Sequence, residues 1–318
     1  MKTISFVVAT KDRPADLRRM LESLALQLPL PDLVIVVDSS AVPVRPLVDQ
    51  FHHRLPLQYL YHQPPSASAQ RNAGIEAVPA DIDLIAFLDD DATLEPDALE
   101  KMLGFWDSAP PDLGGAAFNM VNHPAQAFPR LKRWQLVEAL GVYSGEPGRV
   151  TPSGWQTMTG FVSKDSYVDW LPSTAVAWRA DVLKTCRFDE FFNGYSYLED
   201  LDFSFTIRRG WRLAVVADAR YAHYPSLNRH ASNYAFGKTE VRNRLYFVTK
   251  HGLSYRKCWL GLVLRMGVLL YDAAAGLDTG PLSRALGNCA GVADEIMHRT
   301  VGGLSSRILP ETPIDGQK

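Results

Sequence analysis

The sequence predicts an α/β fold in which a mostly parallel sheet is flanked by helices and is followed by a C-terminal helical extension. Two observations support this prediction. Apolar, β-rich runs alternate with helical patterns through the first 113 residues, and such alternation is typical of a parallel sheet wrapped by helices. Beyond His223 the pattern is helical only.

The composition is that of an ordinary folded protein, and it excludes some function classes. The chain has 318 residues, a length that suits one large domain or two modest ones. It is 47% hydrophobic and 21% charged, as is usual for folded proteins. The net charge of −2 argues against a nucleic-acid partner. Cys186, Cys258 and Cys289 lie far apart and fit no metal or redox spacing, which favours a reducing compartment.

The chain opens with a strand, a helix and a second strand. Residues 4–9 are apolar and β-rich, and Pro14 suits the first turn of the helix that follows. Residues 33–37 form the second apolar run and lead into Asp38. This βαβ unit predicts two parallel strands joined by a right-handed crossover.

The next elements continue the alternation. Residues 58–61 are expected to form a third strand, and residues 66–74 begin a helix that is rich in small side chains. A fourth strand is expected at residues 83–88, and another helix begins at Glu95. Thr10 and Asp38 each follow a strand, so both are expected at the carboxyl edge of the sheet, where such folds bind ligands.

Three consecutive aspartates, Asp89, Asp90 and Asp91, follow the buried run at 85–88. Adjacent anions at a strand end repel one another, and desolvation raises the cost. A divalent cation bound through oxygen ligands would remove this conflict. The alternative is a polar cap that closes the strand before the next helix.

The second half of the chain is less regular. Strands are expected at 115–121, 174–178 and 212–216, and helices at 232–250, 255–275 and 281–298. The stretch between Asn122 and Pro172 is irregular, and a connection of this length is usually functional or mobile.

Four further residues could serve a site at the carboxyl edge. His223 follows the strand at 212–216 and is a candidate metal ligand, the alternative being a histidine with no ligand role. Asp200 could act as a general base, although an acid in the first turn of a helix also favours the helix dipole. Arg71 and Asn72 could meet a diphosphate, hold the carboxylates or simply face solvent.

Several short motifs occur in a set order along residues 3–250, and together they resemble the family 2 glycosyltransferases. The motifs are VVATKDR at 7–13, VVDSS at 36–40, AQRNAG at 69–74, FLDDD at 87–91, FDEFF at 188–192 and YLEDLD at 197–202, with His223 behind them. Each motif is weak alone, and the ordered set is specific. The resemblance implies the nucleotide-diphospho-sugar transferase (GT-A) fold.

The resemblance also implies roles for these residues. Thr10, Arg13 and Asp38 would line the nucleotide pocket, and Asp89 or Asp90 would contact the ribose or the metal. Arg71 is counted with the donor-binding residues for its expected contact with the diphosphate. Asp91 and His223 would hold Mn²⁺ or Mg²⁺, and Asp200 would be the catalytic base.

These roles imply an inverting transfer from a UDP- or dTDP-linked sugar to a hydroxyl of a glycan or a lipid-linked glycan, with cell-surface polysaccharide biosynthesis as the expected use. The chain lacks the Gln-x-x-Arg-Trp motif of processive synthases, which favours a single addition. One alternative is a sugar-phosphate nucleotidyltransferase, although residues 10–14 do not form the Gly-rich loop of that class. The other is an inactive sugar-nucleotide-binding protein.

Aromatic side chains in the irregular stretch could stack on an acceptor sugar. The candidates are Trp134, Tyr143, Trp155, Tyr167 and Trp170, and Glu199 is a further acceptor-side candidate.

We expect a catalytic domain at 1–228, with a nucleotide-binding half (1–113) and an acceptor-binding half (114–228), and a C-terminal helical region at 229–318. Arg256 and Lys257 precede an apolar run at 259–271, which looks too short to span a bilayer. These residues could hold the helices to an anionic membrane surface, while plain packing on the catalytic domain or a homo-oligomer contact are the alternatives. Since the first strand begins at once, we expect a cytoplasmic protein, with peripheral contact at the inner face of the membrane left open.

Overall fold

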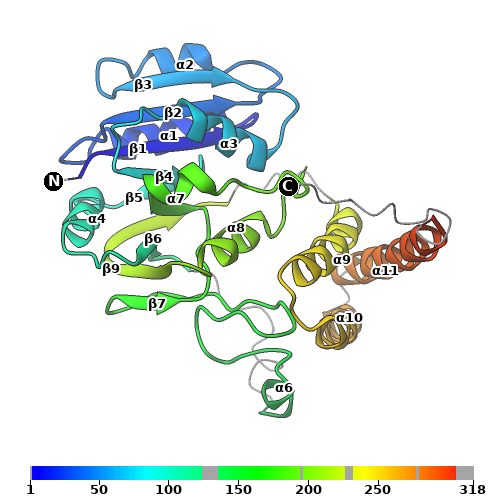
Figure 1. Cartoon of the computed structure of the whole chain (residues 1–318). Helices are drawn as coiled ribbons and strands as arrows, with labels where there is room; N and C mark the ends of the chain where they lie inside the picture. Colours follow the sequence, from blue (N-terminus) through cyan, green and yellow to red (C-terminus); the bar gives the residue numbers. More distant parts are fainter. Residues whose placement is uncertain (1, 124–134, 194–195, 226–231, 277–278, 306–318) are drawn as a thin grey trace, which may run out of the picture.

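The computed structural model describes residues 2–123, 135–193, 196–225, 232–276 and 279–305 (Figure 1). A sheet with the strand order β3-β2-β1-β4-β8-β6-β9-β5 forms its centre, and β7 pairs with β9. The strands are β1 (Ile4–Thr10), β2 (Leu33–Asp38), β3 (Leu57–Tyr61), β4 (Leu84–Leu88), β5 (Ala92–Leu94), β6 (Leu113–Met120), β7 (Ser166–Val168), β8 (Ala175–Arg179) and β9 (Arg212–His223).

Helices cover the sheet and form a separate layer near the C-terminus. They are α1 (Pro14–Leu24), α2 (Arg45–Asp49), α3 (Ala67–Ala77), α4 (Ala98–Asp107), α6 (Gln135–Ala139), α7 (Ala180–Thr185), α8 (Glu199–Ile207), α9 (Asn233–Lys250), α10 (Tyr255–Gly276) and α11 (Thr279–Ser305). Local signals explain several starts. Pro14 opens α1, and the Ser232 hydroxyl accepts the Ala235 N–H at 3.2 Å to cap α9.

Strands β1 to β4 are parallel to one another, as the sequence predicts. In β1 and β2 Thr10 pairs with Asp38, so both residues end at the same edge of the sheet. Strand β8 then runs antiparallel between β4 and β6, while β6 and β9 are again parallel. The mostly parallel α/β sheet is confirmed, and its second half is mixed because β8 enters in the opposite direction.

Both faces of the sheet are buried, which explains the unbroken apolar runs. Phe6 and Val8 pack with α1, α2 and α4 on one face, whereas Val7 packs with α3, α7 and α8 on the other. The same alternation holds in β4, where Ala86 and Phe87 belong to opposite cores.

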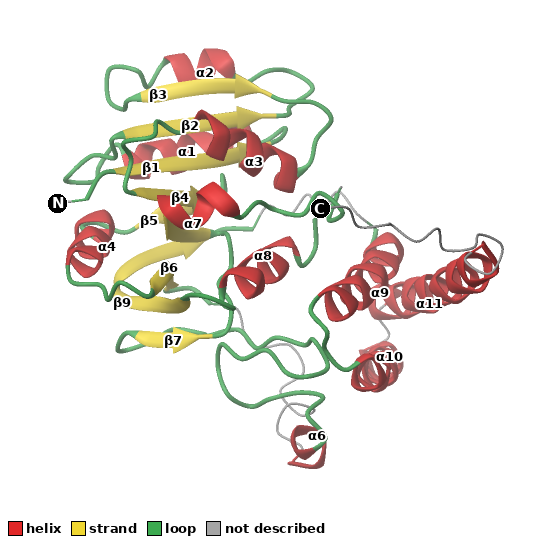
Figure 2. Cartoon of the chain, viewed as in Figure 1, coloured by secondary structure: helices red, strands yellow, loops and turns green. Residues whose placement is uncertain are grey.

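The three C-terminal helices lie on the side of the sheet toward which β1 to β3 point (Figure 2). A third core joins them to the irregular segment, and it includes Trp155, Phe192 and Leu245. Helices α9 and α11 approach each other closely, and glycine at positions 237 and 287 permits this. A side chain at Gly237 or Gly287 would collide with the backbone of the opposite helix.

Four elements differ from the sequence prediction. Strand β9 continues to His223 instead of ending at residue 216, and the three-residue strands β5 and β7 were not expected. Helix α10 is longer than the apolar run at 259–271. Within the described part of the chain, α10 is the one helix that is long and apolar enough to cross a membrane. The expectation that this stretch is too short is therefore wrong.

Candidate active site at the carboxyl edge of the sheet

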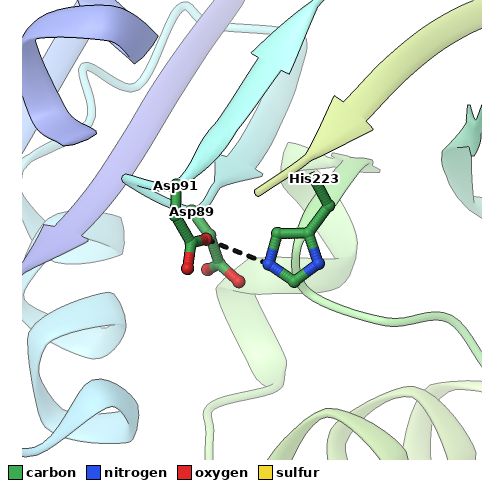
Figure 3. A group of neighbouring side chains, drawn as sticks. All are labelled: Asp89, Asp91 and His223. Carbon is green, nitrogen blue, oxygen red and sulfur yellow. Dashed lines mark hydrogen bonds and ion pairs between the residues drawn. The ribbon is translucent and has the colours of Figure 1, made fainter. Parts of the chain in front are cut away.

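Asp89, Asp91 and His223 form a cluster at the carboxyl edge (Figure 3). After β4, the Asp89 N–H donates to the Thr174 carbonyl at 2.8 Å, which extends the ladder with β8. Strand β5 then pairs antiparallel with the end of β9, where Ala92 faces His223. This register places Asp91 next to His223, and the Asp91 Oδ1 to His223 Nε2 distance is 3.0 Å.

The cluster has the chemistry of a divalent-cation site. One ligand atom from each of its three side chains lies within 4.8 Å of the others. Two carboxylates and an imidazole suit Mn²⁺, and carboxylate oxygens suit Mg²⁺. Burial lowers the pKa of His223, but its bond to Asp91 and the charges of Asp91 and Asp89 outweigh this and raise the pKa. The imidazole therefore stands among excess negative charge that a cation would offset.

The carboxylate of Asp90 points to the β1 loop. Its Oδ2 accepts the Thr10 hydroxyl at 2.7 Å, and its Oδ1 lies 3.2 Å from Arg13 Nη1. The same Arg13 nitrogen lies 3.4 Å from Asp91 Oδ2. Burial raises the pKa of Asp90 to about 7, and the Arg13 charge and the Thr10 hydrogen bond offset this only in part. Asp90 thus ties the predicted nucleotide loop to the cation cluster.

Asp38 is fully buried and shapes the loop that follows β2. Its Oδ1 accepts the Ser40 N–H at 2.8 Å, and its Oδ2 accepts the Val44 N–H at 2.8 Å and the Tyr59 hydroxyl at 2.7 Å. These hydrogen bonds fix the loop at the carboxyl edge, and contact of this carboxylate with the nucleoside stays a prediction. Tyr59, which the sequence did not single out, completes this arrangement.

Three consecutive residues of α3 connect the site. Gln70 Nε2 donates to the Thr10 carbonyl at 3.0 Å and to the Val37 carbonyl at 2.8 Å. Arg71 is buried and bridges two acids, with Nη2 2.9 Å from Asp89 Oδ1 and Nη1 2.8 Å from Glu199 Oε1. Of the roles open from the sequence, Arg71 therefore holds carboxylates and does not face solvent.

Asn72 completes the set. Its side chain donates to the Phe188 carbonyl at 3.0 Å and accepts the Phe188 N–H at 2.9 Å. Small residues let α3 come this close, since a Cβ at Gly74 would collide with Val7. The helix therefore aligns three segments that are distant in sequence.

Glu199 and Asp200 begin α8 next to Arg71. The preceding residue, Leu198, has a φ of 76°, a left-handed conformation that is uncommon for a bulky residue. Its buried side chain and the bond from Asn243 Nδ2 to the Tyr197 carbonyl, at 2.7 Å, hold this turn. Strain held in this way is often found at functional sites.

Burial raises the pKa of both acidic side chains at this turn. For Glu199 the neighbouring Asp200 adds to the rise, and Arg71 opposes it. Asp200 Oδ1 accepts the Leu201 N–H at 2.7 Å, which orients the carboxylate at the start of α8. The raised pKa suits a carboxylate that takes a proton.

Helix α9 fastens α8 through a network that sequence reasoning missed. His251 Nε2 lies 2.8 Å from Asp202 Oδ1, and Lys250 Nζ lies 2.7 Å from Asp202 Oδ2. Lys250 also lies 2.7 Å from Asp189 Oδ2. The signal available in the sequence was Asp202, two residues after Asp200, together with Lys250 and His251 at the end of a predicted helix.

The predicted acceptor aromatics do not meet at this edge. Trp155 is 6% exposed beneath the Arg244 guanidinium, 4.1 Å from the ring centroid, and Trp170 is 3% exposed and donates its Nε1–H to the Thr157 carbonyl at 2.9 Å. Their interpretation as sugar-stacking faces is wrong, because the protein core covers both rings.

The other aromatic candidates are equally unsuitable or lie elsewhere. Tyr143 is buried and donates its hydroxyl to the Gly261 carbonyl at 3.0 Å. Tyr167 is exposed, but β7 pairs with the start of β9, at the end of that strand opposite to His223. Trp134 lies outside the described residues. Among the acceptor-side candidates that the structure describes, only Glu199 lies at the carboxyl edge.

Comparison with known proteins identifies the family. Residues 5–161 match the family described as Glycosyl transferase family 2. This matched segment contains β1 to β6, Arg71 and all three consecutive aspartates. No curated protein sequence matches the chain.

Solved structures with the same fold include S. aureus TarS. TarS 1–349 in complex with UDP is 18% identical, with a TM-score of 0.53 over 86% of this chain and 72% of that one. TarS 1–349 in complex with UDP-GlcNAc is 18% identical, with a TM-score of 0.52 over 86% and 73%. A longer TarS chain is 17% identical, with a TM-score of 0.51, and the match covers 86% of this chain and 44% of that one. The sheet, the acidic cluster and the family match agree: this chain belongs to the family 2 glycosyltransferases.

Proposed function

We propose that the protein is an inverting, metal-dependent glycosyltransferase that moves a sugar from a UDP- or dTDP-linked donor to a hydroxyl of a glycan or a lipid-linked glycan. One observation carries the proposal: Arg71 joins the cluster of Asp89, Asp91 and His223 to the acids Glu199 and Asp200. This bridge would hold a cation site and a base beside each other. The UDP and UDP-GlcNAc complexes of TarS support a nucleotide-sugar donor.

The donor would lie against the cation cluster. Asp89, Asp91 and His223 would hold Mn²⁺ or Mg²⁺, and a cation bound there supplies charge neutralisation for the departing nucleoside diphosphate. Arg13 is 30% exposed next to Asp91 and can contribute a second positive charge to the diphosphate. Thr10 and Asp90 fix the loop that carries Arg13, and Asp38 shapes the neighbouring loop.

Asp200 would act as the general base. Burial raises its pKa, and a base whose pKa lies nearer the working pH accepts a proton more effectively. The acceptor hydroxyl gives its proton to Asp200 while its oxygen forms a bond to the anomeric carbon. The bond from that carbon to the diphosphate oxygen breaks on the opposite side, so a single displacement inverts the configuration.

The remaining assignments follow from this reading. We assign catalysis to residues 1–228 and support of α8 to the helical region at 229–318, where Lys250 and His251 contact Asp202. The cysteines Cys186, Cys258 and Cys289 are free, which supports a cytoplasmic location.

A donor screen tests the proposal. The protein with Mn²⁺ is mixed with a panel of UDP- and dTDP-sugars, and thermal shift and release of nucleoside diphosphate are measured. We expect one donor to stabilise the fold and to be turned over, and we expect Asp91→Asn to abolish both effects. Asp107→Asn changes an exposed acid at the end of α4 and serves as the matched control.

Two results would overturn the proposal. The first is donor turnover that is unchanged in Asp91→Asn and in the presence of a chelator. The second is a product whose anomeric configuration, measured by NMR, matches that of the donor.

A further inference from the structure

The solvent-facing side of α10 carries no charge over three turns. Leu260, Val263, Leu270 and Tyr271 are exposed on it at helical spacing. The charged residue within this stretch is Arg265, which faces inward, with its Nε 2.7 Å from Glu240 Oε1. The outer surface of this helix is therefore apolar.

The outer side of α11 is similar. Leu282, Leu286, Ile296 and Met297 are exposed on it. Two neighbouring charges are turned to other helices: Arg284 lies 3.0 Å from Glu240 and Asp294 lies 2.7 Å from Lys238.

The helices that carry the two apolar sides are neighbours. Helices α10 and α11 pack together, and the Cys289 and Met266 sulfur atoms lie 3.8 Å apart between them. We call the eight exposed side chains the apolar face. Their exposure ranges from 39% for Leu260 to 62% for Tyr271, and the members are Leu260, Val263, Leu270, Tyr271, Leu282, Leu286, Ile296 and Met297.

This face lacks the cover that a core helix would have. Helix α10 is apolar enough for a membrane, yet only 28% of its most apolar 18 residues are buried inside the protein. Contiguous exposed apolar surface of this kind marks an interaction site, because leaving it in water is costly.

We propose that the apolar face lies on the surface of an anionic lipid bilayer, with α10 and α11 in the plane of the interface. Arg256 is exposed one turn before Leu260, and Lys257 follows it, so positive charge lies at the start of the face. The inner side of α10 is occupied by the Arg265–Glu240 pair and by contacts with α9, which suits a helix that lies on a membrane and does not cross it.

The charge at the start of the face favours an anionic bilayer over a second copy of the chain. The exposed Arg256 complements lipid phosphate groups, whereas the eight members of the face carry no acid that would pair with it on a second copy. The inference does not depend on the proposed reaction.

Vesicle flotation of the full chain tests it. The probe is vesicles of equal parts phosphatidylcholine and phosphatidylglycerol. We expect the wild type to float with the vesicles and the double variant Val263→Glu and Leu286→Glu to lose at least about tenfold in bound fraction, because two acids would enter the interface. Both sites are exposed, and circular dichroism checks that the variant is folded.

The matched control is Leu136→Glu, which alters a leucine that is 57% exposed on α6, outside the apolar face, and should float like the wild type. Replacing Arg256 and Lys257 by Gln should weaken flotation on the anionic vesicles. The proposal is overturned if the wild type does not float, or if the double variant floats equally well. It is also overturned if light scattering shows a dimer that the double variant dissociates, since a second copy would then occupy the face.

Discussion

Two groups of buried charges in this protein differ in their balance. At the carboxyl edge, five acids share the guanidinium groups of Arg13 and Arg71 and one imidazole; the acids are Asp89, Asp90, Asp91, Glu199 and Asp200. In the helical layer, the single acid Glu240 is 0% exposed and contacts two guanidinium groups, those of Arg265 at 2.7 Å and Arg284 at 3.0 Å.

The difference separates a site from a structural element. The helical group has at least enough positive charge for its acid, so it can hold α9, α10 and α11 together without a bound cation. The edge group has excess negative charge, and burial raises the pKa of Asp90, Glu199 and Asp200. Excess buried charge of one sign is costly unless a ligand or cation compensates it, which is why perturbed groups gather at functional sites.

The largest effect is expected at the base. Asp200→Asn should lower the transfer rate by about 10²- to 10⁴-fold, the usual contribution of a general base. Donor binding with Mn²⁺ should persist, because the cation cluster is intact. Transfer assays and thermal shift measure the two quantities separately, and a near-normal rate would remove Asp200 from the mechanism.

Substitution of Glu240 in the helical layer should lower the stability of the protein and leave its turnover number unchanged. Glu240→Gln removes the acid from a buried pair and should destabilise the fold by about 3–5 kcal/mol in denaturant unfolding, since Arg265 and Arg284 lose their partner. The turnover number of the folded fraction should stay unchanged. Glu100→Gln, an exposed acid on α4, is the control and should change neither quantity. A lowered turnover number in Glu240→Gln would erase the distinction between the two groups.

A cation ligand should have an intermediate effect. His223→Ala should weaken Mn²⁺ binding by at least the roughly 10- to 100-fold that loss of an outer-shell partner costs. Isothermal titration with Mn²⁺ alone measures this. His52→Ala alters an exposed histidine and should leave the affinity unchanged. Equal affinity in both variants would mean that His223 is not a ligand.

The smallest effect is a displacement of the pH profile. Burial raises the pKa of Asp200, and a base works only when ionised, so activity should be lost as pH falls through that raised pKa. The acid limb should therefore lie above the value of about 3.9 that is ordinary for aspartate. The rate at saturating donor and acceptor, measured across pH, checks this, and an acid limb at the ordinary value would contradict it.

Much of the fold follows from local patterns. The expected strand at 4–9 is β1 (Ile4–Thr10), and the expected helix at 232–250 is α9 (Asn233–Lys250). These elements are predictable because burial on both sheet faces leaves long apolar runs and because Ser232 caps the helix. Strands β5 and β7 are not predictable in this way, since each has three residues and is defined by its pairing with β9.

By itself, the sequence determined that acids end the central strand and that His223 and Asp200 follow later in the chain. Only the tertiary structure decided which of these groups meet. The register of β5 on β9 joins Asp91 to His223, and the close approach of α3 lets Arg71 bridge Asp89 and Glu199. It also decided that Trp155 and Trp170 are core residues. The reason is physical: residue type states what a side chain can bind, whereas strand register and packing decide what lies within its reach.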